Sequence, residues 1–528
     1  MKRSFRITAV VLFTLALVLG GMLGDRVLAL TDEARDHLRL YTELVNVAHE
    51  RYGAQVSYKD LVFSSIQGML RTLDPHTNFL PPEAYTGMRE KQQSSFYGLG
   101  ILVGLRNGQL TVVSPLEGTP ASRLGIQAGD VISTIEGEPT ESLSLDEAVQ
   151  KLKGPKGTQV KVTIVRRGLD KPLSMSVTRA EIPQTTVRFA YMLAPDTGYL
   201  LLSEFSRSTG REMAEAIEKL KGQGMKRLIV DLRNNGGGLL DQAIDTADQF
   251  LPAGSMIVQT KGRTRDSVAD YKADGKYPPL DIPVIVLVNE GTASAAEILA
   301  GAIQDHDMGL LVGTPSWGKG LVQTVYNLSY GSGLALTTAK YYTPSGRLIQ
   351  RDYTSYYDYY THADAGPPKP GSHVAAYATD LGRKVFGGGG ITPDVDVKED
   401  ELTPFAQFLL AHNAFVNFGV EYKARHPIPS PDWKPATSVL DEFRAFLIKE
   451  KVATADEVDQ AYTNQNVKDF ILLEVRAEAL NTAYGQEARS RVITGGDKQV
   501  QSAMTLFDRA AKMLAQRREL KEDKRAAK

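Results

Sequence analysis

The sequence predicts a multidomain α/β protein, and three observations lead to that prediction. At 528 residues the chain exceeds the roughly 250–300 residues at which single hydrophobic cores stop growing. Between residues 197 and 350, apolar strand-like runs alternate with helical stretches, which is typical of α/β structure. Segments of a different character lie on both sides of this part, so we expect three or four folded units.

The first thirty residues have the layout of an export signal. Three basic residues among the first six precede an uncharged run from Ile7 to Gly24. Removal of residues 1–30 as a signal peptide and their retention as a membrane anchor both stay open, because the run is nearly long enough to span a bilayer. We expect export to the periplasm or cell envelope, with anchoring to the inner membrane if the segment is retained.

Two modules precede the α/β part. Residues 31–95 have apolar side chains at three- and four-residue spacing, which predicts an N-terminal helical region. In residues 96–181, glycines separate short alternating runs, which predicts a small β-rich module. One helix is expected there, because Ser144 and Glu147 form a capping box before an apolar run.

The α/β part is expected to span residues 182–400, and a helical C-terminal extension residues 401–528. Residues 351–385 form an insertion in the α/β part, which begins with five tyrosines and continues into a proline-rich stretch. We interpret this insertion as an irregular excursion from the core. After residue 401 the helical period returns and ends in a charged tail.

Composition narrows the possible chemistry. A formal net charge of −1 gives no indication of a nucleic-acid partner. The chain has no cysteine, which excludes a disulfide, a thiolate nucleophile and a cysteine metal site. Hydroxyl, carboxylate, lysine and histidine chemistry remain.

Three loops follow predicted strands, at residues 234–238, 289–294 and 314–320. Ligands gather at such carboxyl ends of strands in open α/β sheets. The first loop is rich in glycine and can present N–H groups to an anion, although a tight strand-to-helix turn is the alternative. In the second loop, Ser294 is a candidate nucleophile on a sharp turn. Ser294 and Glu297 also spell a capping box, and most serines at helix starts are only caps.

A nucleophilic serine needs a base, and Lys319 in the third loop is the preferred candidate. It lies between two glycines with no acidic neighbour within seven residues, and burial without a counter-charge lowers a lysine pKa from about 10.4 toward 7. An exposed surface lysine is the alternative. His306 is disfavoured, because about 18 Å of helix would separate it from Ser294. Gln323, four residues after Lys319, can orient the amine.

Taken together, these segments resemble the carboxy-terminal processing (tail-specific) serine proteases over roughly residues 38–397. The resemblance lies in the order and spacing of eight motifs: Leu73-Asp74-Pro75-His76-Thr77, Tyr97-Gly98-Leu99-Gly100, Asp231-Leu232-Arg233-Asn234, Gly291-Thr292-Ala293-Ser294, Gly318-Lys319-Gly320, Gln323, Tyr342-Thr343-Pro344-Ser345-Gly346 and Gly390-Ile391-Thr392-Pro393-Asp394. The resemblance implies an endopeptidase core of the tail-specific type with Ser294 as nucleophile, Lys319 as general base and Gln323 as the orienting residue. It also implies an oxyanion hole at the N–H groups of Ala295 and Gly237, and no metal or organic cofactor.

The family also carries a PDZ domain, and residues 96–181 fit its place in the chain. Tyr97, Gly98, Leu99 and Gly100 match the loop that captures a terminal carboxylate. With Val149, Leu99 suggests an apolar pocket, so the expected partners are proteins with free, apolar C-termini. A PDZ domain with only a gating role stays open.

Two other functions remain as alternatives. The first is a catalytically silent PDZ scaffold that keeps the protease fold for binding only. The second, a penicillin-recognising enzyme of the serine–lysine type, is disfavoured because Lys319 follows Ser294 by twenty-five residues instead of three. We also expect a homo-oligomer.

Overall fold

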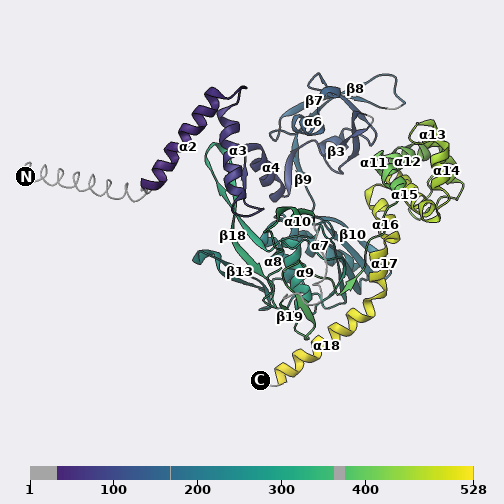
Figure 1. The fold of residues 1–528 in the computed structure, drawn as a ribbon. Coiled ribbons are helices and arrows are strands. Elements are labelled where there is room, and N and C mark those ends of the chain that lie inside the picture. The colour runs from purple at the N-terminus through teal and green to yellow at the C-terminus, as the bar shows by residue number, and fades with distance from the viewer. Residues whose placement is uncertain (1–31, 107, 167, 362–374, 527–528) are drawn as a thin grey trace, which may run out of the picture. The chain divides into compact units, whose positions relative to one another are not determined.

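The computed structural model describes residues 32–106, 108–166, 168–361 and 375–526 (Figure 1). The predicted export segment, residues 1–30, lies outside these ranges. In the parts that are described, no helix has the length and apolar character needed to cross a bilayer.

The chain divides into two compact units, residues 1–79 and 80–528. In the first unit, helices α2 (Asp32–Arg51) and α3 (Tyr58–Arg71) pack on each other, as the predicted helical arm requires. The Tyr41 hydroxyl contacts Ser65 Oγ at 2.5 Å, and the side chain of Ser57 caps α3 by accepting the N–H of Asp60 at 3.0 Å. Short strand β1 (Asn78–Leu80) follows, and α4 (Pro82–Gln92) belongs to the second unit.

A β-rich module with its own core comes next. Its antiparallel sheet has the order β3-β4-β5-β7-β8, with β6 (Glu138–Pro139) beside β5. The sheet strands are β3 (Ile101–Arg106), β4 (Gln109–Pro115), β5 (Val131–Ile135), β7 (Gln159–Val165) and β8 (Leu173–Thr178). The module also contains α5 (Pro120–Arg123) and α6 (Leu145–Leu152), and β2 (Ser95–Gly98) pairs with β9 (Ala180–Pro183) at its boundary. The predicted capping box is present, since the Ser144 N–H donates to Glu147 Oε2 at 2.8 Å.

The α/β part is built on a six-stranded sheet with the order β10-β11-β12-β15-β16-β21. All neighbours are parallel except β10 and β11. The strands are β10 (Val187–Ala194), β11 (Thr197–Leu202), β12 (Arg227–Asp231), β15 (Val284–Val288), β16 (Leu310–Gly313) and β21 (Val395–Asp396). Every residue of β15 is buried and apolar, as expected for a parallel strand that is covered on both faces.

Helices cover both faces of this sheet. On one face, α7 (Thr209–Gly222), α8 (Leu240–Asp248) and α9 (Ala295–Asp305) pack on side chains such as Val230 and Val286. On the other face, the alternate residues Ile229 and Ile285 meet α17 (Lys498–Thr505) and α18 (Phe507–Ala526), which are yellow in Figure 1. These two C-terminal helices therefore complete the core around the central sheet.

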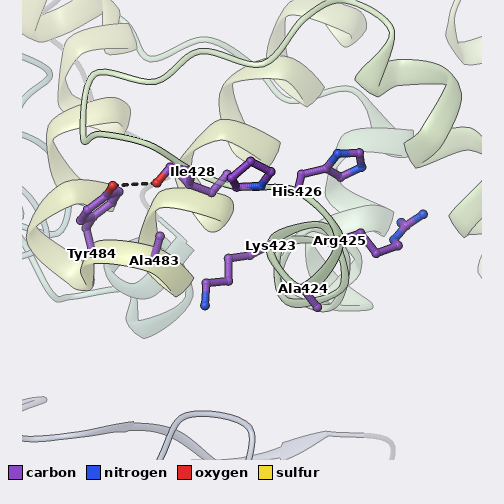
Figure 2. A pocket seen from close by; sticks show the side chains of 8 residues that line it. Lys423, Ala424, Arg425, His426, Ile428, Ala483 and Tyr484 are labelled. Atoms are coloured by element: carbon purple, nitrogen blue, oxygen red, sulfur yellow. Dashed lines mark hydrogen bonds between the residues drawn. The ribbon is translucent and has the colours of Figure 1, made fainter.

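The earlier helices of the C-terminal region form a separate bundle around aromatic residues such as Phe415, Phe418 and Phe443. They are α11 (Pro404–Ala411), α12 (Ala414–Arg425), α13 (Val439–Lys449), α14 (Ala455–Ala461) and α15 (Gln465–Tyr484), and α16 (Gln486–Gly496) follows them. A pocket of about 400 Å³ lies in this bundle. Figure 2 shows its lining residues, among which Tyr484 donates its hydroxyl to the carbonyl of Ile428 at 2.7 Å. No predicted site residue lines this pocket.

A second sheet carries β17 (Leu321–Asn327) and β18 (Gly333–Tyr342), together with β13 (Met256–Gly262) and β14 (Ala269–Lys272). The prediction of an irregular excursion at residues 351–385 is wrong for both described ends of that insertion. Its start folds into α10 (Tyr356–Thr361), and its end forms a hairpin of β19 (Ala376–Ala378) and β20 (Lys384–Phe386). Burial explains why the start of the insertion is ordered, because the side chain of Tyr359 is 0 % exposed.

Candidate active site

The three predicted loops lie together at one edge of the central sheet. They follow β12, β15 and β16, which are adjacent parallel strands, so all three carboxyl ends point the same way. The loop after β15 carries Ser294, and the loop after β16 carries Lys319. The topology therefore brings together residues that are twenty-five positions apart in the sequence.

Ser294 has a strained backbone at the start of α9, with φ 55° and ψ −116°. A positive φ is costly for a residue with a side chain, and such strain persists only where the surroundings enforce it. Here the Ala293 N–H donates to the carbonyl of Asn235 at 2.9 Å, and the Thr292 hydroxyl donates to that of Leu232 at 2.8 Å. A helix-capping serine does not need this conformation, whereas a nucleophile on a sharp turn does.

Glu297 joins the loop that carries Ser294 to the loop that carries Lys319. Its carboxylate is fully buried, and Oε2 accepts the N–H groups of Ser294 at 2.8 Å and Lys319 at 2.9 Å. Because both N–H groups bind the same oxygen, the two backbone nitrogens lie no further apart than the sum of these two distances. The other oxygen, Oε1, accepts the N–H of Gly318 at 2.7 Å and the hydroxyl of Ser316 at 2.5 Å.

Two opposing effects act on the pKa of Glu297. Burial raises the pKa of this carboxyl above its ordinary value, and the hydrogen bonds from Ser316, Lys319, Gly318 and Ser294 oppose that rise. The sequence indicated Glu297 only as the partner in a capping box. The signal that could have revealed more is its position in the first turn of a helix whose next six residues, 298–303, are apolar, where a carboxylate requires several donors.

The loop that carries Lys319 is tightly enclosed. Lys319 is half-buried, and the preceding Trp317 donates its backbone N–H to the carbonyl of Thr292 at 2.9 Å. Gly318 has φ +89°, and a Cβ there would lie 2.9 Å from the nitrogen of Gly390. The loop thus requires glycine beside the lysine, since neither the dihedral angle nor the space allows a side chain.

Gln323 lies on β17, which follows the loop that carries Lys319. Its Nε2 donates to Thr337 Oγ1 at 3.3 Å across the β17–β18 hairpin, next to a register shift between Val322 and Gln323. Its role in orienting Lys319 stays a prediction.

The glycine-rich loop lies directly against Ser294. At Gly237, φ is +94°, and a Cβ would lie 2.7 Å from the carbonyl oxygen of Ala293 and 2.8 Å from the nitrogen of Ala295. Only glycine fits this approach. In this structure the Gly237 N–H donates to Asn235 Oδ1 at 2.9 Å, so an oxyanion bound there would have to share or replace that acceptor. The oxyanion role of Ala295 and Gly237 stays a prediction.

His306 lies at the opposite end of α9 from Ser294, as the sequence predicts. It is the C-terminal cap residue, with Nδ1 2.8 Å from Asp380 Oδ2 and Nε2 2.7 Å from the carbonyl of Met256. Burial by itself lowers the pKa of His306, but these two hydrogen bonds outweigh it and raise the pKa above the ordinary value. Across the described ranges, no group of three or more His, Asp or Glu side chains is arranged to hold a metal ion.

The predicted peptide-binding residues lie in the β-rich module. Strand β3 is the outer strand of its sheet, it contacts α6, and residues 98–100 lead into it. Leu99 is buried in the core of the module, Val149 on α6 is half-buried, and Tyr97 is exposed. Gly100 has φ +77°, and a Cβ there would lie 2.3 Å from Thr119 Cβ, so this loop also requires glycine.

Comparison with known proteins agrees with this arrangement. Residues 196–355 match peptidase family S41, and residues 111–166 match the PDZ domain. The chain is 44% identical over 296 residues to the carboxy-terminal-processing protease of Bartonella bacilliformis, which covers 55% of this chain and 67% of that protein. It is 35% identical over 361 residues to the carboxy-terminal processing protease CtpA of Bacillus subtilis, with 66% of this chain and 76% of that protein covered. A solved structure of the photosystem II D1 C-terminal processing protease is 28% identical and covers 70% of this chain and 94% of that chain, with a TM-score of 0.35.

Fold, motifs and relatives thus define a serine-type peptidase with a PDZ domain. The chain belongs to the carboxy-terminal processing proteases of peptidase family S41.

Proposed function

We propose that this peptidase cuts exported proteins near their C-termini through an acyl-enzyme on Ser294, with Lys319 as general base. The observation that carries the proposal is the shared acceptor, since one oxygen of Glu297 binds the backbone N–H groups of both residues. A nucleophile and its base must be within hydrogen-bond reach of each other, and this contact fixes the two loops close together.

Each residue has a defined step in the proposed reaction. The neutral amine of Lys319 takes the proton of the Ser294 hydroxyl as Oγ attacks the peptide carbonyl. The N–H groups of Ala295 and Gly237 stabilise the oxyanion, and the lysine returns the proton to the leaving amine. The same lysine then activates the water that hydrolyses the acyl-enzyme, while Gln323 keeps the amine oriented.

The PDZ domain is proposed to bind the substrate's C-terminus. An extended peptide would pair with the outer strand β3, with its carboxylate at the N–H groups of residues 98–100. Apolar surface near Leu99 and Val149 favours a small or apolar last side chain. Amidation of the substrate's C-terminus removes the charge that this loop would bind, so slower cleavage of amidated substrate is expected, and equal rates would contradict carboxylate recognition.

Export, membrane anchoring and self-association complete the proposal. The layout of residues 1–30 supports export to the periplasm or envelope, with anchoring if that segment is kept. Leu40, Leu44 and Val47 on α2 are at least half exposed, which supports a homo-oligomer because apolar rows on helices pair readily. Cell fractionation and light scattering test these two expectations.

The central experiment compares the protein with Ser294→Ala on an unstructured substrate that has an apolar C-terminus. We expect cleavage by the unaltered protein and none by Ser294→Ala. Equal loss of substrate with both proteins, or no loss with either, would contradict the assignment of Ser294 as nucleophile.

A further inference from the structure

Residues on both sides of Lys319 reach one buried tyrosine of the insertion. On the N-terminal side, Trp317 donates its indole N–H to the hydroxyl of Tyr359 at 3.1 Å, and the two rings meet edge to face at 5.9 Å. On the C-terminal side, Gly320 donates its N–H to Gln350 Oε1 at 2.8 Å. Gln350 in turn forms a hydrogen bond with Tyr359. Tyr359 is thus connected at two points to the loop that carries Lys319.

Tyr359 is far more deeply buried than its neighbour Tyr357 on α10. Its side chain is 0 % exposed, whereas Tyr357 on the same short helix is 75% exposed. The rings of Tyr353 and Tyr360 meet Tyr359 edge to face at 6.3 and 5.3 Å, so the helix is fixed around the buried ring.

The first residue of the insertion makes a further contact with the same loop. Arg351 donates its backbone N–H to the carbonyl of Gly318 at 2.9 Å. A Cβ on Gly318 would also lie 3.2 Å from the Cβ of Arg351. The start of the insertion therefore packs closely against the loop of Lys319.

We propose that Tyr359 is a positioning residue for the base, which holds the loop of Lys319 in the conformation that lets its amine reach Ser294. This inference rests on the proposed function of Lys319. A small displacement of a catalytic group, of about 1 Å, lowers a rate roughly 100-fold, so a buried support for the loop has a direct effect on turnover. Through the buried side chain of Tyr359, the insertion then supports the loop of Lys319.

A double-mutant cycle tests the contact with Trp317. Tyr359→Phe, Trp317→Phe and the double variant are compared with the unaltered protein for kcat, KM and melting temperature on the unstructured substrate. Each substitution removes the hydrogen bond between Trp317 and Tyr359, so each single variant should lose about five-fold in kcat at unchanged KM. The double variant should be no slower than the slower single one, because both partners are then gone.

Truncation of Tyr359 to alanine should have a larger effect on kcat, and the neighbouring Tyr357 provides the control. Tyr359→Ala should lose roughly 100-fold in kcat, and Tyr357→Ala, on the exposed side of α10, should match the unaltered protein. If Tyr359→Ala does not fold, the cycle of phenylalanine variants decides. Unchanged kcat in folded Tyr359 variants, a lowered melting temperature without loss of kcat, or additive effects in the cycle would each overturn the inference.

The same set of proteins separates this inference from the proposed function. If Lys319→Ala keeps turnover, the proposed base is wrong. If Lys319→Ala is inactive while the Tyr359 variants have unaltered kcat, only the positioning role of Tyr359 fails.

Discussion

The two ends of helix α9 carry similar residue types and hold them in different ways. At the N-terminal end, Glu297 is bound by backbone N–H groups and one hydroxyl. At the C-terminal end, Asp305 pairs with Arg347 and Asp307 pairs with Arg383, both at 2.6 Å. Arg383 also pairs with Asp394 of the last family motif.

This difference separates the proposed catalytic end of α9 from a structural end. The arginine pairs fix carboxylates side chain to side chain and tie α9 to neighbouring segments. Glu297 instead fixes the main chain of two loops, so it sets the positions of Ser294 and Lys319 without using their side chains as partners in these bonds. We therefore expect changes at the first end to lower turnover, and changes at the second end to lower stability.

The largest expected effect is at Lys319. Lys319→Ala and Lys319→Arg should both lower kcat by at least about 10³-fold, because alanine has no base and arginine stays protonated at any usable pH. The melting temperature should stay close to that of the unaltered protein. Measurable turnover by Lys319→Arg would contradict the assignment of the base.

At the other end of α9, Arg347→Met should act on stability. Arg347 is 0 % exposed, and its removal leaves the buried carboxylate of Asp305 without its arginine, at a cost of about 3–5 kcal/mol. Denaturant unfolding measures this loss. The kcat of the folded fraction should stay within about three-fold, and a far larger loss of kcat would break the distinction between the two ends.

Glu297→Gln tests the catalytic end with a change of only one group. An amide has a single acceptor oxygen, so two of the four donors would face an N–H₂ group and both loops would shift. We expect kcat to fall about 100-fold at little change in KM. The matched control is Glu212→Gln. Glu212 lies on a different helix, α7, and also accepts backbone N–H groups, from Thr186 and Val187. A similar loss of kcat in both variants would remove the special role of Glu297.

The sequence predicted the modules and the candidate residues better than the contacts between them. Ser294, Lys319 and Gln323 follow from motifs, and α9 from its apolar period, because local chemistry determines both. Glu297 was interpreted only as a cap, since a capping box and a bridge between two loops have the same local sequence. The burial of Tyr359, and the packing of α17 and α18 on the central sheet, depend on partners far along the chain. Helical periodicity does not identify such partners.

The smallest expected effect is at His306, the residue that a search for a histidine base would choose first. Its hydrogen bonds to Asp380 and to the Met256 carbonyl raise its folded pKa, so the stability that it contributes is fully present below its unfolded pKa of about 6.5. That contribution is lost as the pH rises through the raised folded pKa. His306→Gln should therefore cost about 1 kcal/mol of unfolding free energy at pH 5.5 and less at pH 8.5, a modest amount because the carboxylate of Asp380 is 45% exposed. Asp380→Asn, which keeps the imidazole, should show the same decline with pH.

In both variants kcat should be unaltered, because about 18 Å of helix separates His306 from Ser294. A loss of kcat above ten-fold in folded His306→Gln, with turnover retained in Lys319→Ala, would transfer the role of base to the histidine and reverse the assignment of the two ends of α9.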